Sequence, residues 1–119
     1  MAADSHELEQ DFELSIDRRD RGGTAIALSG ELDLASAPKL DDALTEAIQA
    51  GGEVVLDFER CTFIDSTGIS TIVRAARRLV DEGGRRLSII RLNAQPQKVF
   101  RIAGLTSSGL IALEESAGG

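Results

Sequence analysis

The order in which apolar patterns follow one another is the feature that most constrains how this chain can fold. Residues 11–17 and 24–29 alternate apolar and polar side chains, as half-buried strands do, and Gly22-Gly23 between them predicts an antiparallel hairpin. Helices and strands are then expected to alternate. The expected helices run from Ser36 to Gly51-Gly52, from 65–67 to Gly83-Gly84, and, as a short third helix, from Asn93 to Gly104. The expected strands are a buried one at 54–58, one at 87–92 and a weaker one at 110–113.

This order, β-β-α-β-α-β-α-β, predicts one α/β domain with a mixed, mostly parallel sheet of about five strands and three helices. The hairpin strand is expected at an edge of the sheet, with the helices packed mainly on one side. A length of 119 residues suits a single domain. Residues 1–10 are polar and unpatterned, so we expect a disordered leader there, a folded domain over 11–114 and a flexible tail over 115–119.

The spacing of the apolar residues also predicts which side chains form the core. A hydrophobic fraction of 42% is near the usual range for a globular chain. The positions that fall on the inward faces of the expected elements are Leu28, Leu40, Leu44, Val55, Leu56, Ile69, Ile72, Val73, Ile89 and Leu110.

The composition argues against several classes of function. The formal charge is 13 − 20 = −7, which argues against binding to nucleic acid or to an anionic membrane. No run of 18 apolar residues occurs, so no membrane-spanning helix is expected, and the polar N-terminus is unlike a signal peptide. The single cysteine, Cys61, is expected to be a small buried hydrophobe, and its lack of a disulfide partner favours a reducing, cytoplasmic compartment.

Metal, cofactor and nucleophilic chemistry find little support in the residue types present. The single histidine, His6, lies in the polar leader, so neither a zinc site nor a Ser-His-Asp triad is expected. The glycine pairs match no phosphate-binding loop. We therefore expect no metal, no cofactor and no enzymatic activity.

A polar cluster follows the central strand and opens a helix: Asp65, Ser66, Thr67 and Gly68. Ligands and partners of open α/β sheets gather at the carboxyl ends of strands. A helix N-terminus also favours negative charge, so a phosphate on Ser66 would be tolerated there. The same residue types are ordinary helix caps, and glycine permits close packing, so the local pattern alone favours a structural cap.

Over the whole domain, the chain resembles the STAS family, and within it the anti-sigma factor antagonists. The resemblance runs from about Phe12 to Leu113 and rests on these segments: Gly30-Glu31-Leu32-Asp33, Ala37-Pro38-Lys39-Leu40, Val55-Leu56-Asp57-Phe58, Ile64-Asp65-Ser66-Thr67-Gly68-Ile69 and Phe100-Arg101-Ile102-Ala103-Gly104-Leu105. It implies that a partner which is both an anti-sigma factor and a serine kinase phosphorylates Ser66. A serine phosphatase is a further expected partner.

The same resemblance implies a contact surface for the anti-sigma factor, formed by Asp33, Asp65, Ser66, Thr67 and Gly68. Binding of the unphosphorylated protein would release a sigma factor, and a phosphate on Ser66 would weaken the complex through its bulk and charge. Two alternatives stay open. One is an unswitched STAS scaffold in a stressosome-like or lipid transport complex. The other is an enzyme with Ser66 as nucleophile, although no histidine lies near Ser66 to act as its base.

Two features depart from the family pattern. Antagonists usually carry a further helix after the last strand, whereas only residues 114–119 follow it here, so an edge or face of the sheet is expected to be less covered. Arg74, Arg77 and Arg78 match no family motif, and we interpret them as a solvated helix face.

Overall fold

A hairpin followed by alternating helices and strands builds the described part of this protein. The computed structural model describes residues 12–20, 22–107 and 109–114, and the expected leader at 1–10 and tail at 115–119 lie outside these ranges. The elements are β1 (Glu13–Arg18), β2 (Thr24–Leu32), α2 (Ala37–Ala50), β3 (Val54–Ile64), α3 (Ser66–Gly83), β4 (Leu87–Ile90), α4 (Ala94–Ile102), the short 3-10 helix η1 (Leu105–Ser107) and β5 (Ile111–Leu113).

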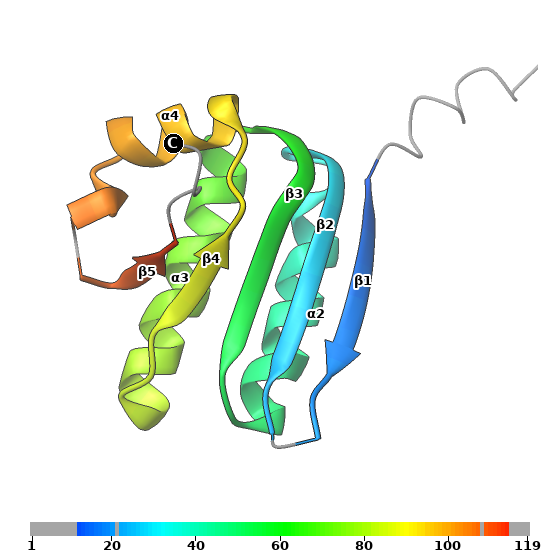
Figure 1. Ribbon diagram of the computed structural model, residues 1–119, viewed down its shortest axis with the longest axis vertical. Coiled ribbons are helices and arrows are strands. Elements are labelled where there is room, and N and C mark those ends of the chain that lie inside the picture. The colour runs from blue at the N-terminus through cyan, green and yellow to red at the C-terminus, as the bar shows by residue number, and fades with distance from the viewer. Residues whose placement is uncertain (1–11, 21, 108, 115–119) are drawn as a thin grey trace, which may run out of the picture.

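The strands of the described residues form one five-stranded sheet in the order β1-β2-β3-β4-β5. β1 pairs antiparallel with β2, and the pairs β2–β3, β3–β4 and β4–β5 are parallel. Figure 1 shows α2 and α3 side by side behind the sheet, and α4 at the end where β3 runs into α3. The predicted mixed sheet, with its hairpin strand at an edge and its helices mainly on one side, is therefore confirmed.

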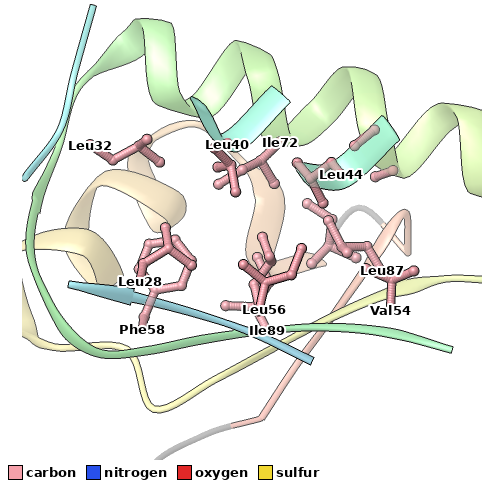
Figure 2. Close-up of a cluster of buried hydrophobic side chains, with 14 of the residues drawn as sticks. Leu28, Leu32, Leu40, Leu44, Val54, Leu56, Phe58, Ile72, Leu87 and Ile89 are labelled. Atoms are coloured by element: carbon pink, nitrogen blue, oxygen red, sulfur yellow. The ribbon is translucent and has the colours of Figure 1, made fainter. Parts of the chain in front are cut away.

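The core lies between the sheet and the two long helices. Figure 2 shows strand residues such as Leu56 and Ile89 facing helix residues such as Leu40 and Ile72. The predicted core residues that are buried are Leu28, Leu40, Leu44, Val55, Leu56, Ile72 and Ile89. Phe58 and Phe100, which the spacing did not single out, are fully buried and pack edge to face with ring centroids 5.9 Å apart.

Three core predictions need correction. Ile69, Val73 and Leu110 are only partly buried, and they pack against the core from its margin. Val55 is buried as predicted, but successive side chains of a strand point to opposite faces, so Val55 lies on the other face of the sheet from Leu56, outside the cluster under the helices. A continuous apolar run does not reveal which of its residues face the helices, because both faces of such a strand look alike in sequence.

The central strands are longer than the sequence predicts. Strands are predicted over 24–29 and 54–58, whereas β2 continues to Leu32 and β3 continues to Ile64. Two register shifts interrupt their pairing, and Gly30 takes a φ of 102° between them. Such bulges hide the two-residue period that identifies a strand in sequence. The extension ends in the pair Leu32–Ile64, directly before the polar cluster.

The helix boundaries follow the predicted signals closely. α2 begins after Ser36 and α3 after Asp65, as expected. β4 ends at Ile90, two residues before its predicted end, because Arg91 turns the chain with a left-handed φ of 60°. Gly104, with a φ of 79°, then turns the chain after α4.

Candidate functional site

Asp65 joins the end of the sheet to the start of α3. Its backbone is extended, and its side-chain Oδ1 accepts a hydrogen bond from the Gly68 backbone N–H at 3.0 Å. Its own N–H donates to the carbonyl oxygen of Leu32 at 3.2 Å, and its carbonyl oxygen accepts from Ile69 N at 3.0 Å. Asp65 is therefore a true helix cap, and it holds the first turn of α3 against the end of β2.

Ser66 is the first residue of α3, and its side chain is exposed. Among the residues that the structure describes, none makes a hydrogen bond to its hydroxyl oxygen. The hydroxyl thus stands free at the positive end of an 18-residue helix. A modifying enzyme can reach this oxygen without opening any part of the described fold.

Thr67 and Gly68 belong to the first turn of α3, and both are less exposed than Ser66. Thr67 is half-buried, and its carbonyl oxygen accepts a hydrogen bond from the Thr71 hydroxyl at 3.0 Å. Gly68 is buried, and a Cβ added there would lie 2.8 Å from side-chain carbons of both Ile64 and Leu32. Of the predicted contact residues, Gly68 thus lies beneath the surface, where it allows α3 to approach the two strands.

Asp33 closes the loop between β2 and α2. Its Oδ1 accepts hydrogen bonds from the backbone N–H groups of Ala35 and Ser36, both at 3.1 Å. The buried Ser36 hydroxyl accepts from Asp33 N at 2.9 Å and donates to the Glu31 carbonyl oxygen at 2.7 Å. Ser36 was expected to start the helix, and it does, but its side chain organises this loop and does not cap α2.

Leu34 stands at the tip of this loop with 73% of its surface exposed. The loop follows Leu32, which pairs with Ile64 and accepts the Asp65 N–H, so Asp33 and Leu34 lie at the same end of the sheet as Ser66. Sequence reasoning missed Leu34, because a leucine in a short polar loop carries no periodic signal. We call Asp33, Leu34, Asp65, Ser66 and Thr67 the Ser66 surface.

Cys61 is buried as expected, whereas the predicted solvated arginine face is confirmed only for Arg74 and Arg77. Cys61 is fully buried, and its Sγ donates to the carbonyl oxygen of Phe63 at 3.4 Å. Burial raises the pKa of the Cys61 thiol above its ordinary value, and the negative charge of Glu31 adds to the rise. Arg74 and Arg77 are exposed, and the Arg74 Nη2 atom lies 3.9 Å from Asp41 Oδ1 in an exposed ion pair. Arg78 departs from the expected solvated face, because it is half-buried and its Nη1 donates a hydrogen bond to the Thr45 hydroxyl on α2 at 3.2 Å.

The described residues hold no group of three or more His, Cys, Asp or Glu side chains that would bind a metal ion. Asp57 is already engaged, since its Oδ2 lies 3.4 Å from Arg91 Nε and its Oδ1 accepts from Glu59 N at 3.0 Å. Within the described ranges, no helix is long and apolar enough to cross a membrane. His6 falls outside those ranges.

Comparison with known proteins points to one family. A family model described as "Mlab, STAS domain" matches residues 16–113. Anti-sigma-B factor antagonists of Staphylococcus aureus and Bacillus subtilis are each 28% identical to this chain, over 81 and 80 residues; the aligned segments cover 67% of this chain and 74% and 72% of these relatives.

Solved structures share the fold. The anti-sigma factor antagonist SpoIIAA in its unphosphorylated form aligns with a TM-score of 0.71 and 24% identity, over 89% of this chain and 91% of that one. The phosphorylated form of the Bacillus cell fate determinant SpoIIAA aligns with a TM-score of 0.67 and 24% identity, over 89% and 95%. An antagonist from Mycobacterium paratuberculosis aligns with a TM-score of 0.75 and 19% identity, over 90% and 88%.

A mixed sheet with α2 and α3 on one face, and an exposed serine at the start of the helix that follows its central strand, defines a small α/β domain. The family model spans most of the chain, so this chain belongs to the STAS domain family. Its named relatives are anti-sigma factor antagonists, which confirms the resemblance found in the sequence.

Proposed function

We propose that this protein is a phosphorylation-switched anti-sigma factor antagonist. In its unphosphorylated form, the Ser66 surface binds an anti-sigma factor that is also a serine kinase, and this binding releases a sigma factor. The observation that carries the proposal is the free, exposed hydroxyl of Ser66 on the first turn of α3, beside the closed Asp33 loop. The named relatives and the family resemblance support the choice of partner.

The switch acts through charge at one point of the surface. The kinase transfers the γ-phosphoryl group of ATP to Ser66 Oγ, which releases ADP and one proton. The phosphate adds a charge of about −1.5 to −2 beside the carboxylate of Asp65. A partner surface that accepts a neutral hydroxyl next to that carboxylate then meets added bulk and like charge, so the complex weakens.

The fold itself tolerates the modification. The positive end of the α3 dipole lies at Ser66, and an anionic group there is favourable. The likeness of this fold to SpoIIAA in both its unphosphorylated and its phosphorylated form agrees with a phosphate that leaves the architecture intact. A serine phosphatase would remove the phosphate and return the protein to its binding form.

The protein acts in this scheme as a binding partner and kinase substrate, without catalysis of its own. A serine nucleophile needs a base, and the residues that the structure describes contain no histidine. The nearest carboxylate along the chain, Asp65, is held by the Gly68 N–H as a helix cap. A single cysteine without a disulfide partner in the chain suits a reducing compartment, so we include a cytoplasmic location in the proposal.

A second candidate function is an unswitched STAS scaffold in a stressosome-like or lipid transport complex. The family model that matches 16–113 favours keeping it, because its description names a STAS domain and no anti-sigma factor. Ser66 would then be simply the first residue of a capped helix.

The two functions separate in one experiment. Each serine-kinase anti-sigma factor encoded in the source genome is purified and titrated against the protein by calorimetry, with and without prior incubation with Mg-ATP. We expect one of them to bind the unmodified protein, to place phosphate on Ser66, and to bind the phosphorylated form at least about tenfold more weakly. Absence of binding by every candidate, or equal affinity for both forms, would leave the scaffold as the better account.

A further inference from the structure

Within residues 12–20, 22–107 and 109–114, no strand pairs with the second half of β3 on the side of β4. β4 pairs with β3 only at Val55, Leu56 and Asp57, and Arg91 then turns the chain away. Residues 58–64 nevertheless continue as a strand to the start of α3. The backbone groups on this side need other partners, because a buried, unpaired peptide group is costly.

Asn93, just before α4, supplies the first of these partners. Its Nδ2 lies 3.3 Å from the carbonyl oxygen of Phe58, 2.9 Å from that of Glu59 and 3.0 Å from that of Cys61. An amide NH2 group has two hydrogens, so the three carbonyl groups share them. The Asn93 side chain thus pins the bulged middle of β3, where the regular pairing with β2 is interrupted.

Gln95, in the first turn of α4, pairs with the last residue of β3. Its Oε1 accepts a hydrogen bond from Ile64 N at 2.9 Å, and its Nε2 donates to Ile64 O at 3.1 Å. One side-chain amide therefore satisfies both backbone groups of one residue, as a neighbouring strand would. The reverse orientation of the amide would place N–H against N–H, so the chemistry admits a single arrangement.

We call the two hydrogen bonds between the Gln95 side chain and the Ile64 backbone the amide clamp. The amide clamp acts directly on the segment that carries Ser66. Ile64 is buried and is followed by Asp65, whose cap defines the first turn of α3. Figure 1 shows α4 at the end of the sheet where β3 passes into α3. The position of the Ile64 peptide groups therefore sets where Ser66 stands relative to the loop of Asp33.

We propose that Gln95 is a positioning residue for Ser66, assisted by Asn93. The proposal rests on the proposed function, in which Ser66 is the phosphate acceptor. The amide clamp holds Ile64 in one conformation, so that Ser66 meets the kinase in the geometry that phosphoryl transfer requires. Without the clamp, water replaces the amide at Ile64, and the segment that leads to Ser66 samples other positions.

The test compares variants at Gln95 with a matched control on the same helix. Gln95→Ala removes both hydrogen bonds, whereas Gln97→Ala removes the same residue type at a half-buried position that makes neither bond. The probes are Mg-ATP and the kinase identified in the experiment above. We expect kcat/KM for phosphate incorporation at Ser66 to fall by about tenfold to a hundredfold in Gln95→Ala, carried mainly by kcat, and to stay at the wild-type value in Gln97→Ala.

A second variant separates positioning from loss of folding. Gln95→Glu keeps the acceptor for Ile64 N, but its ionised form has no hydrogen to donate to Ile64 O. Protonation of the introduced carboxyl restores that donor. Relative to wild type at the same pH, phosphorylation of Gln95→Glu is therefore expected to recover as the pH falls toward 5. Circular dichroism melts at each pH show whether Gln95→Glu is fully folded at the assay temperature, so that recovery in a folded protein reports positioning and recovery that only follows refolding contradicts it.

Amide hydrogen exchange gives a readout that does not depend on any kinase. Exchange at Ile64 is expected to quicken by at least about tenfold in Gln95→Ala and to be unchanged in Gln97→Ala. Unchanged exchange at Ile64, or equal phosphorylation of Gln95→Ala and wild type, would overturn the positioning role. If no kinase acts on the wild-type protein, the proposed function fails, and faster exchange at Ile64 alone would not restore the role assigned to Gln95 in phosphorylation.

Discussion

The Oδ1 atom of Asp65 lies 3.0 Å from the backbone nitrogen of Gly68, so the carboxylate next to Ser66 is bound to its own helix. The nearby carboxylate of Asp33 is likewise engaged with its own loop, at Ala35 and Ser36. The family resemblance assigns both acidic residues to partner contact. In the structure, each of them fixes the backbone of its own segment through these hydrogen bonds. In the proposed function, such a side chain would meet the partner through its second oxygen and through the backbone that it holds in place.

Replacing Asp65 with alanine is expected to lower the stability of the folded protein, independently of any effect on binding. Asp65→Ala removes the cap on Gly68 N, and the loss of such a cap typically costs about 0.5–2 kcal/mol of folding free energy. Asp65→Asn retains a side-chain oxygen and should stay close to the wild-type stability. Chemical denaturation of the three proteins measures the difference. Equal midpoints for all three would show that the hydrogen bond to Gly68 contributes nothing to stability.

Gly68 is expected to tolerate no side chain. In a free helix, Gly→Ala is stabilising by about 1 kcal/mol, but here the new Cβ would lie 2.8 Å from carbons of Ile64 and Leu32. We expect Gly68→Ala to destabilise the protein by about 1–3 kcal/mol through overpacking. Ser70→Ala, at an exposed position of the same helix, is the control and should change stability by less than about 0.5 kcal/mol. A stabilised Gly68→Ala protein would contradict the close approach of α3 to the strands.

Ser66 variants are expected to separate binding from stability. Ser66→Ala should bind the kinase partner and resist phosphorylation, so that it antagonises the partner persistently. Ser66→Asp should bind more weakly while it melts close to the wild-type temperature, because an acidic residue is favourable at the start of a helix. Its effect should be smaller than that of phosphate, which carries more charge and more acceptor oxygens. Titration calorimetry and circular dichroism melts measure both properties.

Two outcomes would contradict the switch at Ser66. One is equal affinity of wild type, Ser66→Ala and Ser66→Asp for the kinase partner. The other is phosphate on Thr62 or Thr67 in place of Ser66, found by mass spectrometry of the reacted protein.

Leu56 is expected to be among the most sensitive core positions. It is fully buried, and it lies in the cluster between the sheet and the helices in Figure 2. Leu56→Ala should cost about 2–5 kcal/mol, which combines lost burial with the cavity that remains. The same substitution at the exposed Leu34 should cost less than about 0.5 kcal/mol. Urea unfolding of both variants makes the comparison, and similar losses at the two positions would refute the assigned burial.

Cys61 is expected to make stability fall at alkaline pH. Burial raises the thiol pKa in the folded protein, so the unfolded chain loses this proton at a lower pH than the folded one. The contribution of the neutral thiol is fully present below the ordinary thiol pKa of about 8.5, and it is lost as the pH rises toward the folded-state pKa. Urea unfolding between pH 7 and 10 should show a steeper decline for wild type than for Cys61→Ala. Parallel declines would rule out the shifted thiol.

The sequence by itself determined the features that depend on neighbours along the chain. Alternating side chains predicted the edge hairpin, and helical spacing predicted α2 and α3, because each side chain's environment in these elements follows from its period. The polar cluster at Asp65 predicted a capped helix start, because a cap bonds to a residue three positions away. The position of Ser66 on an exposed first turn follows from these local rules.

Only the tertiary structure decided how that turn is held. The extension of β3 to Ile64 depends on backbone pairing with β2. The exposed polar side chains in this part of β3 give no sign of that pairing in the sequence. Gln95 meets Ile64 across 31 residues of sequence, and no period or motif links the two. Backbone hydrogen-bonding groups are identical in every residue except proline, so their long-range partners leave no trace in the sequence until the fold brings them together.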